Sequence, residues 1–495
     1  MEYAVTLFLC VIITILVWLW SKTRRATNWP PGPPTIPFLG NLNINFGDMI
    51  TEFRRFRQQY GDIYSLVIGS QTVVVVNGLD TPKEMFVKNG DIVSERADSF
   101  LVSEVTKRKG IASSSGSLWK EHRTFALSTL REFGFGKRIM EHKILEEVDV
   151  FLASLRKTKG TSFDISPLLS TSVSNVISSI AFGRRFEHDD ANFNKITNAI
   201  SENFSDSIMA GILTFFPFLR RIPGDPLNVG HFMKNVEMVN SFTQGIVDER
   251  KKSFEQEGKA GDIREVTNYL DAYLKQRKDA PTESTFTDEQ LQVSITDLFL
   301  GGTETTSTVL QWFILILLHK PEIQEHMRAE IHKIVGESRF PSTADRSKLP
   351  YCNSVLHEVL RFGNISPLPL PHGLTEDLHF HGYLIPKHAL LIPNLDSVLN
   401  DTAIYENPSE FVPTRFLSED GTVSGTEKVY TFGIGRRVCL GESLARMEFF
   451  LFATSMIQRF KFIPPDGYQL PALSQYKYGL TRQPLNFKFK AVEYI

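Results

Sequence analysis

The sequence predicts a mainly α-helical fold with small β-sheets, in a single large domain behind an N-terminal transmembrane helix. Helical hydrophobic periods run from about residue 48 to about residue 460 without a strong linker. One of these periods is long enough for a helix that crosses the whole domain. The first 20 residues contain an uncharged apolar run. With 42% hydrophobic and 22% charged residues among 495, the composition is that of a globular protein.

The apolar run, residues 3–20, carries no charge and is close to the lower limit of about 18 residues for crossing a bilayer. A cleaved signal peptide is the alternative, but that requires a basic start, a shorter apolar core and a small-residue cleavage site. Here the basic residues Lys22, Arg24 and Arg25 follow the run instead. Because basic residues prefer the cytoplasmic side, we expect a retained anchor with a cytoplasmic body.

Residues 21–41 form a basic and proline-rich segment. Five prolines stand too close together for a helix: Pro30, Pro31, Pro33, Pro34 and Pro37. We expect a stiff, extended hinge between the anchor and the body, residues 42–495. A proline-rich ligand for a partner protein is the alternative.

Short strands are predicted at Val73–Val76 and Gly382–Pro393, the second of which holds two apolar runs around a turn. Residues 255–286 are the most polar and least periodic part of the body. We interpret them as a surface excursion rather than as a domain boundary.

The clearest helix begins at Thr287, which with Gln290 three residues later forms a capping-box pattern. Lys320-Pro321 ends the apolar period after about 30 residues, or roughly 45 Å at 1.5 Å per residue. We expect so long a helix to cross the core of the domain.

Charge and cysteine content narrow the function classes. A net charge of −2 argues against general nucleic-acid binding. Cys10, Cys352 and Cys439 are too widely spaced for a disulfide framework or a zinc site.

Cys439 lies in a turn rich in glycine and arginine, directly before a helical pattern. A thiolate there would be stabilised by the helix N-terminus, by backbone N–H groups and by Arg436 and Arg437. The residues alone leave three readings open: a buried structural thiol, a nucleophile and a metal-bound thiolate.

The motif Phe432-x-x-Gly435-x-Arg437-x-Cys439-x-Gly441 resembles the haem-binding signature of the cytochrome P-450 family. The resemblance implies haem b as cofactor, with Cys439 as the axial thiolate ligand of its iron. It also implies that Arg437 reaches a haem propionate and that Phe432 packs beside the sulfur.

The resemblance covers nearly the whole chain. Glu358 and Arg361 resemble the E-x-x-R helix of the family, and Arg415 resembles the arginine that joins this pair. The resemblance is to the animal microsomal family-2 type in three segments: residues 116–138, 216–224 and 479–484.

Three further residues are implied as propionate ligands. Trp119 and Arg123 share one helical face and resemble the helix that donates to the propionates. His372, in a Pro-His pair, resembles the propionate-binding histidine of animal microsomal members.

The long helix contains the run GGTETT, residues 301–306. Two glycines inside a helix cost about 1 kcal/mol each relative to alanine, which indicates a close approach of something flat or a local kink. An ordinary polar turn is the alternative. The resemblance implies an oxygen-binding groove, in which Thr305 hydrogen-bonds dioxygen and Glu304 helps to supply protons.

The implied activity is that of a monooxygenase, which inserts one atom of O2 into lipophilic substrates by hydroxylation or epoxidation. Fatty acids, steroids and foreign compounds are the candidate substrates. No GxGxxG motif stands in a strand–turn–helix setting, so electrons must come from a separate protein. By resemblance this is NADPH–cytochrome P-450 reductase, with cytochrome b5 as a further candidate, at the endoplasmic reticulum membrane.

Two other functions stay open. One is a non-catalytic haem sensor or carrier, and the other is a thiolate-haem isomerase that needs no external electrons. The presence of both Glu304 and Thr305 favours monooxygenation over either.

The last predictions concern the protein surface and the substrate pocket. The docking face for the electron donor is expected from four basic residues: Lys120, Arg131, Lys137 and Arg436. The resemblance implies seven apolar wall residues: Phe100, Leu101, Ile212, Leu298, Phe299, Leu368 and Leu370. The apolar run Ile208–Leu219 is a candidate second membrane contact, with a core helix as the alternative.

Overall fold

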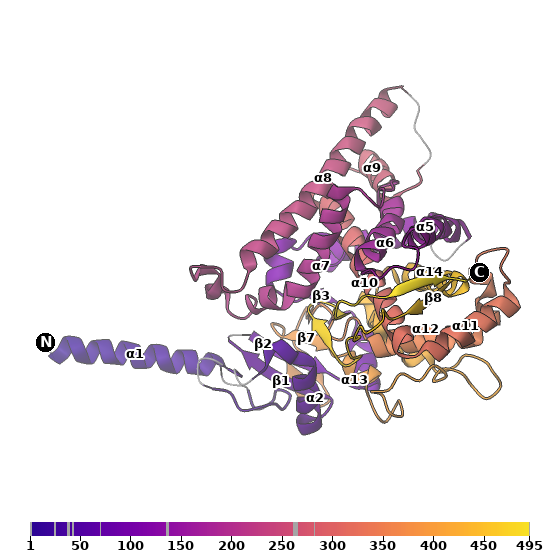
Figure 1. The fold of residues 1–495 in the computed structure, drawn as a ribbon. Coiled ribbons are helices and arrows are strands. Elements are labelled where there is room, and N and C mark those ends of the chain that lie inside the picture. The colour runs from indigo at the N-terminus through magenta and orange to yellow at the C-terminus, as the bar shows by residue number, and fades with distance from the viewer. Residues whose placement is uncertain are drawn as a thin grey trace.

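A computed structural model describes residues 2–23, 26–36, 40–41, 44–69, 71–134, 138–260, 266–281 and 283–494. Helices dominate it, and short strands form small sheets at one side (Figure 1). The helices are α1 Glu2–Thr23, α2 Met49–Tyr60, α3 Asp80–Pro82, α4 Gly116–Glu132, α5 Arg138–Lys157, α6 Ser166–Ala181, α7 Ala191–Ile212, α8 Val229–Ala260, α9 Tyr269–Asp279, α10 Asp288–His319, α11 Pro321–Ile334, α12 Pro350–Gly363, α13 Asp396–Leu399 and α14 Glu442–Arg459.

The strands are β1 Ile63–Ile68, β2 Gln71–Val76, β3 Glu95–Arg96, β4 His372–Gly373, β5 Leu378–Phe380, β6 Tyr383–Ile385, β7 Leu390–Pro393, β8 Phe460–Ile463, β9 Tyr476–Tyr478, β10 Arg482–Pro484 and β11 Lys490–Glu493. The prediction of a mainly α-helical single domain with small sheets is confirmed.

Helix α10 crosses the core, as its length predicts, and packs against α6, α8 and α14. The Thr287 hydroxyl accepts the Gln290 amide N–H at 3.2 Å, so the predicted N-cap is confirmed. The other half of the capping box is wrong. The Gln290 side chain bonds instead to the backbone N–H and carbonyl of Gly110, each at 3.0 Å.

The largest sheet has the strand order β1-β2-β7-β4-β3. Strand β2 contains the predicted segment Val73–Val76 and pairs in parallel with β7, with Val73 opposite Leu390. The two apolar runs of Gly382–Pro393 do not act as one unit. Because a turn at Pro386 separates them, β6 pairs with β5 while β7 joins the main sheet.

The polar segment 255–286 contains more helix than its sequence predicts. Helix α8 continues to Ala260, and α9 buries Tyr269, Leu270 and Tyr273 in the core. The interpretation of this segment as a surface excursion is therefore wrong for α9. Charged residues stand between and after its buried positions, so its apolar period is hard to recognise in the sequence.

Helix α1 extends away from the body (Figure 1) and covers the predicted segment 3–20. Large apolar side chains are exposed along it, among them Tyr3, Leu7, Phe8, Ile13 and Trp18. Within the described residues, no helix combines the length and the apolarity that a membrane crossing requires. The transmembrane anchor is not confirmed.

The later part of the predicted hinge lies on the body. The carbonyl of Pro30 accepts the Ser65 hydroxyl at 2.6 Å, and that of Pro31 accepts the Ser65 N–H at 2.7 Å. The chain that leads from α1 into the body is therefore fixed to strand β1.

Candidate active site

A cavity of about 370 Å³ lies in the core between α10, the start of α14 and the loop before α14. Cys439 and Phe432 come from that loop, and Gly301 and Thr305 come from α10. Most of the remaining wall is apolar, with Leu298, Val309, Ile365, Leu370 and Leu480 among its side chains. A thiol and a polar helix face therefore share one largely apolar space.

The loop that carries Cys439 is held by its own backbone and by a close contact. The Cys439 N–H donates to the Phe432 carbonyl at 2.9 Å. Gly435 has a φ of +76°, and a Cβ at this position would overlap the carbonyl oxygen of Phe86. Only glycine fits there, and helix α14 begins three residues after the cysteine.

The protein alone does not favour the thiolate form of Cys439. Burial raises the pKa of the thiol, and the Gly441 N–H and Arg123 only partly oppose this. The expectation that Arg436 and Arg437 stabilise the thiolate is wrong, because their guanidinium groups bind elsewhere. Arg436 pairs with Asp91 at 2.5 Å. A bound metal cation would supply the neighbouring positive charge that is needed to stabilise the thiolate.

Arg437 belongs to a group of hydrogen-bond donors beside the cavity and is held there by two backbone carbonyls. Its Nε donates to the Ser94 carbonyl and its Nη2 to the Ser114 carbonyl, both at 2.7 Å. The guanidinium carbon lies 3.8 Å from the centre of the Trp119 ring. Among the described residues, Arg437 Nη1 and Trp119 Nε1 are buried donors without a hydrogen-bond partner. An anionic group would satisfy them.

Two more arginines line the same cavity, Arg123 and Arg96. Arg123 Nη2 donates to the Val438 carbonyl at 2.6 Å, next to the cysteine. Burial, together with repulsion among the three arginines, lowers the pKa of Arg437 to about 8 and that of Arg96 to about 10. The sequence analysis missed Arg96. Three buried guanidinium groups with few negative neighbours favour an anionic ligand.

His372 also lines the cavity and is buried. Its Nδ1 donates to the Val93 carbonyl at 2.9 Å, and its ring lies 4.8 Å from that of Phe86. Burial, followed by the charges of Arg96 and Arg437, lowers the pKa of His372 to about 3. The imidazole is therefore neutral at physiological pH.

The α10 face toward the cavity carries Gly301 and Thr305, and the Thr305 hydroxyl donates to the Gly301 carbonyl at 2.7 Å. The two glycines serve different purposes. Gly301 leaves open space, whereas a Cβ at Gly302 would lie 2.6 Å from Ile177 of α6.

Glu304 does not line the cavity. Its carboxylate is buried and accepts the Thr308 hydroxyl at 3.0 Å and the Gln483 amide at 2.7 Å. Burial raises the pKa of Glu304 to about 7, because these donors offset only part of the desolvation.

The family model for cytochrome P450 matches residues 30–491. The chain belongs to the cytochrome P450 family. It is 37% identical over 462 residues to cytochrome P450 2H1 of Gallus gallus, with 92% of each chain covered. It is 37% identical over 490 residues to cytochrome P450 2D26 of Rattus norvegicus (97% of each chain) and over 466 residues to cytochrome P450 2C8 of Homo sapiens (93% of each chain). The resemblance to the family-2 type is confirmed.

Membership makes this chain a haem-thiolate monooxygenase that takes electrons from NAD(P)H through a reductase. The cavity of this P450 fits haem b. Cys439 provides a thiol for the iron. Arg437 Nη1 and Trp119 Nε1 are buried donors free for the two carboxylates, and Arg96 and Arg123 add positive charge to the cavity wall.

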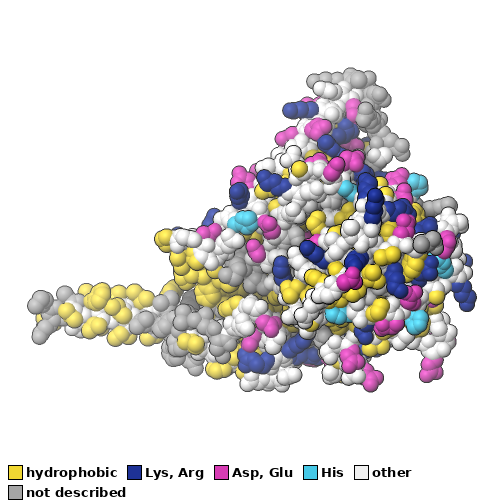
Figure 2. Space-filling model, in the orientation of Figure 1, with side chains coloured by type: hydrophobic (Ala, Val, Ile, Leu, Met, Phe, Trp, Pro, Cys, Tyr) yellow, Lys and Arg dark blue, Asp and Glu magenta, His cyan; other side chains and the backbone are white. Residues whose placement is uncertain are grey.

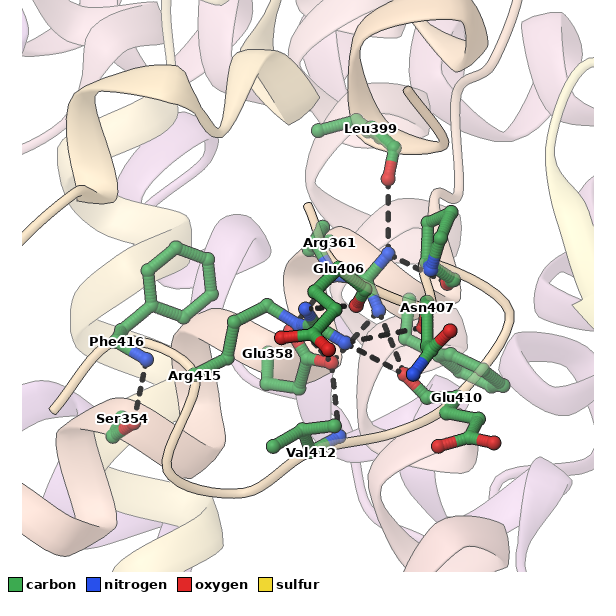
Figure 3. Close-up of polar contacts among 12 residues, drawn as sticks. Ser354, Glu358, Arg361, Leu399, Glu406, Asn407, Glu410, Val412, Arg415 and Phe416 are labelled. Atoms are coloured by element: carbon green, nitrogen blue, oxygen red, sulfur yellow. Dashed lines mark hydrogen bonds and ion pairs between the residues drawn. The ribbon is translucent and has the colours of Figure 1, made fainter. Parts of the chain in front are cut away.

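Behind the cysteine loop, the P450 triad is assembled (Figure 3). Arg361 makes two 2.7 Å contacts with Glu358, and Arg415 Nε lies 3.0 Å from the same carboxylate. Arg361 also donates to the Leu399 carbonyl at 2.9 Å. The Thr431 hydroxyl donates to a carbonyl of the same helix, α12, and ties the triad to the cysteine loop.

The cavity wall differs from the implied set. Leu298 and Leu370 line it, but Phe299 packs among the rings of Phe182, Phe193 and Phe242. The other four implied wall residues do not line the cavity either: Phe100, Leu101, Ile212 and Leu368. Phe100 and Leu101 belong instead to a separate cluster with Phe232, and Leu368 packs against the cluster around strands β1 and β2.

The predicted docking face and the predicted second membrane contact fall partly outside the described residues. Lys137 of the docking face lies outside them, as do the side chains of residues 208–210 of the membrane contact. The other three basic residues of the expected docking face are exposed: Lys120, Arg131 and Arg436.

Proposed function

We propose that this enzyme oxidises small lipophilic substrates in the cavity beside Cys439. The observation that carries the proposal is the combination of a thiol and the Thr305 hydroxyl on the wall of one mostly apolar cavity. Fatty acids, steroids and foreign compounds present the C–H bonds and alkenes that such a wall accommodates.

Substrate binding rests on the apolar residues. Leu298, Leu370 and Leu480 would hold a hydrocarbon by contact and exclude water from the reaction. Asp297 also reaches the cavity, but its carboxylate is occupied by the N–H groups of Ile111 and Ala112, at 2.7 and 2.9 Å. The wall therefore selects for apolar surface rather than for charge.

Bound haem would supply the electron-accepting and oxygen-activating chemistry, and Cys439 would hold its iron through the thiolate. Thr305 would hold a proton at the cavity through its hydroxyl, which at rest donates to Gly301. Glu304 would replenish that proton. Its pKa of about 7 suits a general acid at neutral pH. Because Glu304 is turned away from the cavity, the carboxyl must turn toward Thr305 to act.

The first test is the absorbance of the reduced, carbon monoxide-treated protein. We expect the Soret band of thiolate-ligated haem from the native chain and its loss in Cys439→Ala. The native band in Cys439→Ala would contradict the ligand assignment. A panel of lauric acid, testosterone and 7-ethoxycoumarin, with NADPH and reductase, then tests the substrate class. No oxidised product from any of the three would contradict it.

Proton supply is tested by the yield of product per NADPH. Thr305→Ala and Glu304→Gln should both retain haem but divert reducing equivalents to hydrogen peroxide. Coupling equal to that of the native enzyme in Glu304→Gln would remove Glu304 from the mechanism.

The electron donor is proposed to be NADPH–cytochrome P450 reductase, with cytochrome b5 as a second partner. The exposed Lys120 and Arg131 support a basic docking face, while Arg436 is already paired with Asp91. Lys120→Glu should raise the KM for reductase without changing the haem spectrum. An unchanged KM would exclude Lys120 from the docking face.

We propose that residues 3–20 hold the enzyme at the endoplasmic reticulum membrane, with residues 21–41 as the hinge and residues 42–495 on the cytoplasmic side. The apolar side chains exposed on α1 support this, as do Phe218 and Ile222, which are 62% and 44% exposed. Figure 2 displays a further hydrophobic area on the body near the base of α1.

Deleting residues 1–28 tests the attachment by flotation with liposomes. We expect most of the protein to leave the membrane fraction. Phe218→Ser together with Ile222→Ser in the shortened chain should release the remainder. Full flotation of the shortened chain would show that α1 is not needed.

A further inference from the structure

Glu304 is held by a residue from a distant part of the chain. Gln483, on strand β10, donates from Nε2 to Glu304 Oε1 at 2.7 Å, and only 8% of this glutamine is exposed. The partner atom on Glu304 is the same oxygen that accepts from Thr308, on the next turn of α10. The Glu304 carboxyl is therefore held by hydrogen bonds to its own helix and to β10.

The other end of the Gln483 amide binds helix α7. Gln483 Oε1 accepts the Ser205 hydroxyl at 2.8 Å, and Gln483 Nε2 also approaches the Thr481 hydroxyl at 3.3 Å. The turn before β10 is fixed to the same helix, since the Leu480 N–H donates to the Phe204 carbonyl at 2.8 Å. Helix α7 and the residues around β10 thus form one unit, which reaches Glu304 through Gln483 and through Ser201 of α7.

This unit also forms part of the cavity wall. Phe204, Leu480 and Thr481 line the cavity, one residue before Ser205 and two or three residues before Gln483. A substrate that fills this side of the cavity would press on the two segments that position the acid.

We propose that Gln483 is a positioning residue, which holds the Glu304 carboxyl away from the cavity until substrate contacts Phe204, Leu480 and Thr481. The inference rests on the proton-supplying role of Glu304 proposed above. Contact with substrate shifts α7 or the turn before β10, loosens the Gln483 hydrogen bonds and lets the carboxyl turn toward Thr305. Proton supply then follows occupancy of the cavity.

Among the described residues, two side chains from outside α10 donate to Glu304, Gln483 of β10 and Ser201 of α7, and Gln483 is the one that links both segments. The causes of the pKa of Glu304 are burial and three neutral donors, Thr308, Ser201 and Gln483, with no charged group among them. Arg482, the neighbour of Gln483, donates instead to the carbonyls of Phe362 and Gly363. Glu448, the buried carboxyl of α14, is bonded to Thr306.

The test measures NADPH oxidation by the full chain with reductase, first without substrate and then with the panel compound that the native enzyme oxidises. Gln483→Met keeps the length of the side chain but removes its N–H donors. We expect substrate-free oxidation to rise about fivefold, the factor that corresponds to one ordinary hydrogen bond. Ser205→Ala, a milder change, should act in the same direction. Both variants should retain the thiolate-haem spectrum.

The dependence of NADPH oxidation on pH gives an independent readout. Because the Gln483 donor lowers the pKa of Glu304, its loss should move the midpoint of the profile upward by about 0.7 of a pH unit. Ser207→Ala is the matched control, since that hydroxyl donates to Phe204 within α7 and does not touch Gln483. It should move neither the midpoint nor the substrate-free rate.

Glu304→Gln separates the two proposals. In that background, Gln483→Met should have no further effect on substrate-free oxidation. The same rise with and without Glu304 would overturn the inference, because Gln483 would then act on packing alone. No rise in Gln483→Met, beside a clear loss of coupling in Glu304→Gln, would overturn the inference and leave the proton-supplying role standing. Unchanged coupling in Glu304→Gln would overturn both.

Discussion

Glu358 and Arg361 face each other across one turn of α12, with both side chains fully buried and two N–O contacts of 2.7 Å (Figure 3). Two parallel contacts between a guanidinium and a carboxylate fix orientation as well as distance. Arg361 also donates to the carbonyl of Leu399, at the end of α13, and to that of Pro408, in the chain that follows. The pair therefore fastens α12 to the approach to the cysteine loop.

Glu358→Gln should destabilise the enzyme by about 3–5 kcal/mol, because it leaves a buried guanidinium without its counter-charge. Arg415→Lys should cost less, since Arg415 lies at the edge of the triad and its side chain is 9% exposed. Urea denaturation of the haem-loaded proteins measures both. Equal losses in the two variants would contradict the distinct role of the inner pair.

The adjacent arginines Arg437 and Arg436 should differ sharply in haem retention. Arg437 has a buried donor without a partner, whereas Arg436 is exposed and paired with Asp91. Arg437→Met should weaken haem binding by about 10- to 100-fold, the range of one charge-assisted hydrogen bond. Arg436→Met should leave it unchanged. Transfer of haem to apomyoglobin measures the two rates, and equal rates would refute the assigned donor role.

Gly435→Ala should disrupt the cysteine loop, because a Cβ would overlap the Phe86 carbonyl and the φ of +76° disfavours other residues. Strain of this kind costs about 1–3 kcal/mol even before the overlap is relieved. Gly336→Ala is the control, since Gly336 has a nearly equal φ of +75° but lies outside the cavity and a Cβ there meets nothing within 4 Å. The yield of thiolate-ligated haem per polypeptide compares the two, and a normal yield from Gly435→Ala would show that the loop relaxes freely.

Glu448 should make stability depend on pH. Burial raises its pKa from 4.5 to about 8, so the folded chain keeps a proton that the unfolded chain loses. Stability should therefore fall as the pH rises from about 4.5 to about 8, by about 5 kcal/mol in order of magnitude, and level off outside this window.

Glu448→Gln should make that slope clearly shallower, as urea denaturation across this pH range would reveal, while the raised pKa of Glu304 leaves part of the slope in place. Glu442→Gln is the matched control on the same helix, because Glu442 is partly exposed and paired with Arg446. A slope in Glu448→Gln as steep as that of the native enzyme would assign the pH dependence to other groups.

The sequence predicts those parts of the site whose residues are close in the chain. Phe432, Arg437 and Cys439 fall within one short motif, and all three line the cavity. Thr287 caps α10 by a local contact, which a local pattern can predict.

Contacts between distant segments could not be predicted in this way. Arg96 lies in a two-residue strand, and its place depends on pairing with His372, far along the chain. Gln483 carries no motif, and only the packing of β10 on α7 brings it to Glu304. The orientation of Glu304 away from the cavity likewise depends on these neighbours rather than on its position in the helix.

The donors of Arg437 to the carbonyls of Ser94 and Ser114 join residues 343 and 323 positions apart. A ribosome that adds about 5–20 residues per second needs many seconds between these two ends of the site. Until Cys439 has emerged, the nascent chain displays arginines and an apolar wall with no ligand for iron. The site is therefore incomplete until the C-terminal part of the chain has been made, so capture of the cofactor comes late in the biosynthesis of the enzyme.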